Sequence, residues 1–104
     1  MPKFMFAYHG GGVPETPEEG EKVMAAWMSW MQELGEAIVD PGNPVGLSST
    51  LTKSGLSEGG GANPLSGYTI VQADTLDAAA EMGKGCPILD GGNGSIEIAE
   101  IHEM

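Results

Sequence analysis

The chain has 104 residues, a length that corresponds to a single domain, here residues 1–104. It carries 15 acidic residues against 4 basic ones, a formal net charge of −11, so we expect neither nucleic acid nor an anionic membrane as partner, because both require a basic surface. The sequence has no run of about 18 apolar residues and no recognisable signal peptide, and its single cysteine excludes an internal disulfide, so we expect a cytoplasmic location.

Residues 3–9 predict the first strand. Phe4, Phe6 and Tyr8 fall on one face by the two-residue period of a strand, and the alternate residues, including His9, fall on the other. Both faces are largely apolar, which predicts a central strand that is covered on both sides. The glycines at 10–12 then end the pattern and are interpreted as a turn, since no P-loop lysine follows them.

A helix is predicted to begin after Thr16, with Pro17 at its first position and Glu19 completing a capping box, and to end at Gly35. Its apolar stripe spans an arc of roughly 160°, wider than the roughly 100° that facing one sheet requires. The surplus width predicts a second contact, and we interpret the stripe as core or interface rather than as a cofactor site. The stripe consists of Val23, Met24, Trp27, Met28, Trp30, Met31 and Leu34.

A short second strand is predicted at 37–39, followed by the turn residues 40–44. The connector 41–66 is rich in Gly, Ser and Pro, and within it 47–53 alternates weakly enough to predict at most an edge strand. Its four leucines lead us to expect a lid or a dimer arm rather than a disordered linker.

The remaining elements are a strand at 68–73, a helix capped by Asp74 or Thr75 and ended by Gly83 and Gly85, and a last strand at 95–102 with a possible bulge near Ala99. This order predicts an α+β, ferredoxin-like βαββαβ fold: an antiparallel sheet with two helices on one face. Because the other face also carries apolar residues, we expect a homodimer.

Five segments resemble the YCII-related (DGPF) family over nearly the whole chain: FMFAYHGG, TPEEGEKVMAAWMSWMQELG, AIVDPGNPVG, GYTIVQADTLDAAAEMGKGCPIL and SIEIAEIHEM. The resemblance implies a ferredoxin-like domain that dimerises face to face into a dimeric α+β barrel. It also implies, for some members, a His–Asp pair proposed as an acid/base site. The Asp of that pair matches Asp40, whereas the first helix of this chain contains no His.

His9 and Asp40 are the candidate catalytic residues. The predicted topology places the ends of their strands on the same sheet edge, with one strand between them and about 10 Å apart. An imidazole suits proton transfer near neutral pH, but His9 equally fits a partly buried side chain bonded to a loop carbonyl. Asp40 equally fits the side chain of an Asx-turn.

We expect no metal site, because the antiparallel topology places His102 at the opposite edge from His9. Cys86 follows a helix C-terminus, which disfavours the thiolate, so we interpret it as structural.

Two functions remain open. The first is a small cofactor-free enzyme that uses His9 as acid/base on a hydrophobic small molecule, with Asp40 orienting it and Tyr8 and Tyr68 contacting the ligand. The second is a non-catalytic module that binds a small ligand or another protein.

Overall fold

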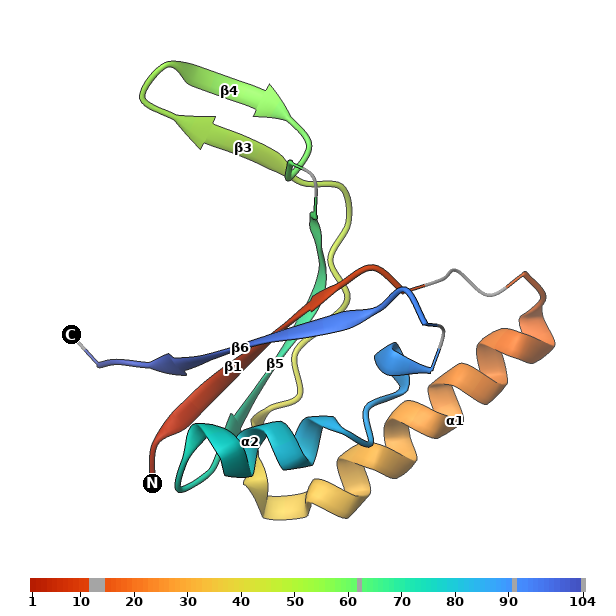
Figure 1. The fold of residues 1–104 in the computed structure, drawn as a ribbon. Helices are drawn as coiled ribbons and strands as arrows, with labels where there is room; N and C mark the ends of the chain where they lie inside the picture. The colour runs from red at the N-terminus through yellow and green to blue at the C-terminus, as the bar shows by residue number, and fades with distance from the viewer. Residues whose placement is uncertain (12–14, 62, 91, 104) are drawn as a thin grey trace.

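The computed structural model describes residues 1–11, 15–61, 63–90 and 92–103. It has the predicted α+β architecture, in which an antiparallel four-stranded sheet of order β2-β5-β1-β6 carries both helices on one face (Figure 1). Strands β2 and β6 form its edges. The sheet strands are β1 (Lys3–His9), β2 (Ile38–Asp40), β5 (Leu65–Gln72) and β6 (Ser95–Ile101), and the helices are α1 (Pro17–Leu34) and α2 (Leu76–Gly83).

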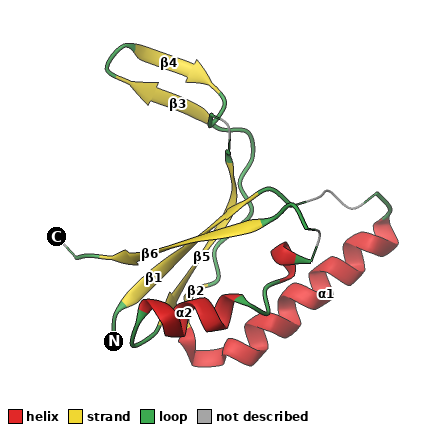
Figure 2. Cartoon of the chain, in the orientation of Figure 1, coloured by secondary structure: helices red, strands yellow, loops and turns green. Residues whose placement is uncertain are grey.

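Strand β1 has the bounds that its alternation predicts, and it pairs with β5 on one side and β6 on the other. The side chains of Phe4, Phe6 and Tyr8 are buried in the core beneath the helices. The alternate residues of β1 face the other side of the sheet, which neither of the described helices covers, and we call this side the open face (Figure 2).

Helix α1 begins and ends where its capping residues predict. The Thr16 hydroxyl accepts a hydrogen bond from the backbone N–H of Glu19, and the Glu19 carboxylate accepts one from the N–H of Glu15. Gly35 ends the helix with a φ of 53°, a conformation that glycine adopts without a Cβ penalty. A 3₁₀ turn at Gly35–Ala37 then leads into β2.

The later elements differ from expectation in detail. The Thr75 hydroxyl caps α2, and β5 begins at Leu65, earlier than its apolar run predicts. The expected bulge near Ala99 is wrong, because the pairing of β6 with β1 runs without a shift from Ser95 to Ile101. The irregularity lies in β5 instead, where Ser66 is the extra residue between the partners of Tyr8 and His9.

The connector forms a hairpin rather than an edge strand of the main sheet. Strand β3 (Ser49–Thr52) pairs only with β4 (Gly55–Glu58), in a separate two-stranded sheet. We call residues 47–59 the arm. Figure 1 shows the arm projecting beyond the N-terminal end of β5, away from the helices.

The turn after β2 returns along β5 and packs closely against it. Asn43 accepts a backbone hydrogen bond from Tyr68, and Val45 donates one to Ser66. Gly42 makes this approach possible, since a Cβ at that position would lie 1.7 Å from the Tyr68 carbonyl oxygen and its φ is +73°.

Replacing Gly42 with Ala should therefore lower the free energy of unfolding by about 2–4 kcal/mol, through backbone strain and overlap with β5. The matched control is Gly46→Ala, because a Cβ there meets nothing within 4 Å. That variant should stay within about 0.5 kcal/mol of the wild type. Urea denaturation measures both, and equal losses would contradict the close approach of turn and strand.

Candidate functional site

A cavity of about 390 Å³ lies on the helix side of the sheet. Helix α1 forms one wall, the turn 41–44 forms another, and residues of β1 and β5 lie between them. From α1 the lining residues are Val23, Met24, Trp27, Met28 and Met31. From the sheet and its loops they are Tyr8, Gly10, Gly11, Pro41, Gly42, Asn43, Pro44, Ser66, Gly67, Tyr68, Thr69 and Ile88.

The aromatic side chains of α1 hold the helix to the sheet. Trp30 is buried, lies 6.4 Å from the Phe6 ring and donates a hydrogen bond from Nε1 to the Met82 carbonyl at 2.9 Å. Trp27 packs edge-on against Tyr8 at 5.2 Å. Met24 and Met28, six and two residues closer to the helix N-terminus than Trp30, remain exposed and border the cavity. The wide apolar stripe thus divides between the core and the cavity wall.

A short chain of hydrogen bonds fixes the cavity floor. The Tyr8 hydroxyl donates to Thr69 Oγ1 at 2.7 Å, and the Thr69 hydroxyl donates to the Pro41 carbonyl at 3.0 Å. Burial raises the pKa of Tyr8, so its hydroxyl stays protonated at neutral pH. The chain joins β1, β5 and the turn 41–44, and it gives the Tyr8 hydroxyl a structural partner.

The cavity wall is uncharged. None of its described lining residues is Asp, Glu, Lys, Arg or His, although the chain holds 15 acidic residues. An ionic ligand would therefore enter without a counter-charge, at a high desolvation cost. The wall suits a neutral, largely apolar molecule.

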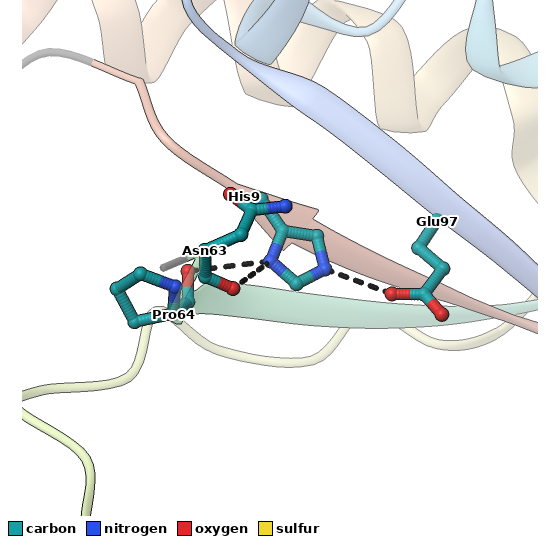
Figure 3. A network of polar contacts seen from close by, with 4 residues as sticks. All are labelled: His9, Asn63, Pro64 and Glu97. Carbon is teal, nitrogen blue, oxygen red and sulfur yellow. Dashed lines mark hydrogen bonds and ion pairs between the residues drawn. The ribbon is translucent and has the colours of Figure 1, made fainter. Parts of the chain in front are cut away.

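His9 lies on the open face and does not line the cavity. Its side chain is 9% exposed. Nδ1 lies 2.9 Å from the carbonyl oxygen of Asn63 and 3.3 Å from that of Pro64, and Nε2 lies 3.0 Å from Oε1 of Glu97 (Figure 3). Carbonyl and carboxylate oxygens are acceptors, so a ring protonated on both nitrogens donates to both sides. His9 thus joins the end of β1 to the segment between the arm and β5 and to β6.

The expected proximity of His9 and Asp40 is wrong. His9 pairs with Leu65, whereas Asp40 pairs with Ile70, near the other end of β5. At about 3.3 Å per residue, the two positions are offset by about 15 Å along the strand. The Asp40 carboxylate instead accepts a hydrogen bond from the Gly42 N–H at 2.8 Å, the Asx-turn arrangement.

Tyr8 and Tyr68 both border the cavity, but they lie on different faces of the sheet. Tyr68 pairs with Ala7, so its side chain projects on the open face, and its position at the cavity edge follows from its contact with Gly42.

Cys86 is fully buried next to Tyr8, and burial raises the pKa of its thiol to about 11. A thiol with a raised pKa is a poor nucleophile, consistent with a structural role.

His102 is exposed beyond the end of β6, 3.8 Å from a Glu100 carboxylate oxygen. In the part of the chain that the structure describes, no three His, Cys, Asp or Glu side chains are grouped as metal ligands would be. Within the same residues, neither helix is both long and apolar enough to cross a bilayer.

Two features of these sites were missed from the sequence. Glu97 is the carboxylate beside His9, and its alternation with Ile96 and Ile98 placed it on the correct face without giving its register. The second feature is the turn 41–44, which forms a cavity wall. The signal for it in the sequence was Gly42, because a glycine permits the turn to pack closely against β5.

No family model matches this chain, and no curated protein matches it either. Among solved structures it is similar to the 5-chloro-2-hydroxyhydroquinone dehydrochlorinase TftG from Burkholderia phenoliruptrix AC1100, in complex with 2,5-dihydroxybenzoquinone. The two sequences are 14% identical, the TM-score is 0.60, and the match covers 100% of this chain and 96% of that chain. This likeness supports the α+β fold.

The buried thiol predicts a loss of stability in alkaline solution. The folded state holds the Cys86 pKa above its ordinary value of 9.0, so its contribution is complete below pH 9 and is lost as the pH rises to about 11. The free energy of unfolding of the wild type should fall across this window, and that of Cys86→Ala should fall by roughly 2–3 kcal/mol less. Urea denaturation from pH 7 to 11 measures the difference, and parallel curves would refute it.

Proposed function

We propose that the protein binds a small, uncharged and predominantly apolar molecule in the cavity between α1 and the sheet. The observation that carries this proposal is the composition of the wall: a cavity of about 390 Å³ with no charged residue among its described lining, in a chain of net charge −11. Cavities of this size and polarity are typical of small-molecule sites.

The residues that line the cavity favour a ligand with a ring. Trp27 and Tyr8 offer aromatic surface, and the thioethers of the α1 methionines adapt their shape and contact aromatic edges well. Asn43, exposed at the end of the turn, supplies a polar group at the border of the cavity. The similar dehydrochlorinase structure holds a small cyclic compound, 2,5-dihydroxybenzoquinone, which supports a ligand of this size for the fold.

A charge placed on the cavity wall should weaken binding. We expect Met28→Glu to raise the dissociation constant for neutral aromatic ligands, such as hydroquinone or naphthol, at least tenfold, because the carboxylate must be desolvated beside the ligand. Ser29→Glu adds the same charge at the next α1 position, outside the lining, and should change the constant less than twofold. Quenching of tryptophan fluorescence and calorimetry measure both. Equal effects of the two variants, or no binding by the wild type, would refute the proposal.

We infer as a second candidate that the protein is an enzyme whose acid/base group is His9. The pairing of His9 Nε2 with Glu97 at 3.0 Å favours it, because a carboxylate that orients an imidazole is a common arrangement for proton transfer. In this candidate Glu97 takes the orienting role that the sequence had given to Asp40. The resemblance to the YCII-related family supports it, since the dimer expected there covers the open face and would enclose the pair.

The enzymatic candidate requires His9 and Glu97 together. In turnover assays on chlorinated and hydroxylated aromatic compounds, His9→Gln and Glu97→Gln should each lower the rate by about 10²–10⁴-fold. His102→Gln is the control and should retain the wild-type rate, since that ring is exposed beyond β6. Full turnover by His9→Gln would leave the cavity-binding function alone.

A further inference from the structure

The arm carries two exposed leucines that no other described residue of the chain covers. Leu51 and Leu56 are directly opposite in the β3–β4 pairing, so they lie on the same face of the hairpin, and they are 76% and 72% exposed. The neighbouring pair, Thr50 and Ser57, lies on the other face and is polar. The arm therefore presents an exposed leucine pair on one face, beside Ser49 and Glu58, and hydroxyl side chains on the other.

A two-stranded hairpin is at best marginally stable in water unless its apolar face is covered. The side-chain hydrogen bonds of the arm are local, such as that from the Thr50 hydroxyl to the Gly59 carbonyl. Burial of the two exposed leucines would favour the folded hairpin. A docking partner would supply this stabilisation.

The arm stands on the open side of the sheet. Between the arm and β5, the carbonyl oxygens of Asn63 and Pro64 lie within hydrogen-bond distance of His9 Nδ1, and the His9 side chain lies on the open face (Figure 3). Figure 1 shows both helices on the opposite side of the sheet. A binding partner that covers the open face would therefore also contact the arm.

The charge distribution favours a second copy of this chain as that binding partner. Two copies of net charge −11 repel each other and approach best through surfaces where charges balance. On the open face and the arm, Lys3 and Lys53 stand against Glu97, Glu58 and, at the β2 edge, Asp40, which pairs with Ile70, so these surfaces are closer to neutral than α1. Helix α1 carries four glutamates against one lysine, namely Glu18, Glu19, Glu21, Glu33 and Lys22.

The open face also offers an apolar surface for the leucines. By register, Met5 of β1, Ile70 of β5 and Ala99 of β6 lie across it in one row. Met5 is 39% exposed although it lies on a central strand. In a face-to-face pair, this row and the leucine face of the partner's arm can both be covered.

We propose that the arm is a clasp, in which each copy packs its Leu51–Leu56 pair onto the open sheet face of a second copy. This proposal rests on the dimer that accompanies the second candidate function, and of the two roles expected for the connector, lid or dimer arm, it selects the second. The cavity lies on the other side of the sheet, so ligand binding there is a separate property. The clasp also explains why His9 fixes the base of the arm.

The test compares two double variants of the same hairpin by sedimentation equilibrium. Leu51→Thr with Leu56→Thr keeps residues that favour strands and removes the apolar face, so the dimer dissociation constant should rise at least tenfold. The control, Thr50→Ser with Ser57→Thr, alters the opposite face and keeps a hydroxyl near Gly59, so the constant should change less than twofold. Equal constants for both variants would overturn the clasp.

Amide exchange of the wild-type protein provides a second measurement that does not depend on a variant. Arm amides should be protected at concentrations where the dimer forms and should exchange rapidly on dilution to monomer. Rapid exchange in the dimer would overturn the clasp, and a wild-type monomer at micromolar concentration would overturn both clasp and dimer. Quenching of tryptophan fluorescence by a neutral aromatic ligand, measured in parallel, tests the cavity proposal separately.

Discussion

Helix α1 is anchored to the sheet by its aromatic side chains, and the rest of the candidate site depends on this. Trp30 stacks on Phe6 and donates to the Met82 carbonyl, and Trp27 packs edge-on against Tyr8. Contacts of this kind bury large areas and also fix ring geometry. The methionines closer to the helix N-terminus have no such partners, and the space beside them is the cavity. The same helix therefore stabilises the core and lines the uncharged cavity.

Strand β1 separates the two candidate functions by its alternation. Tyr8 faces the helices, where its hydroxyl, through Thr69, ties the turn 41–44 to the cavity floor. His9 faces the opposite side, where it joins the arm to Glu97. Successive residues of one strand thus lie beside the cavity on one face and on the open face on the other. Since the sheet lies between them, each function can be disturbed while the other is kept.

The candidate site was predicted less completely than the fold. His9 and Asp40 were expected to be neighbours because their strands run parallel, but β2 is three residues long and pairs with the far end of β5. Strand order follows from topology rules, whereas register depends on how the turn 41–44 packs against β5. The carboxylate at His9 is Glu97, which is distant in sequence and adjacent only through the pairing of β1 with β6.

The sequence by itself determined the elements, because their signals are local: the alternation of residues 3–9, the Thr16 and Thr75 caps, and the glycine that ends α1. Together with chain order, these signals determined the α+β class and the arrangement of the sheet. Only the tertiary structure decided the offset of Asp40 from His9, the bulge at Ser66, and the pairing of β3 with β4 apart from the main sheet. Register and docking depend on contacts between residues far apart in the chain, and periodicity carries no information about which of those contacts form.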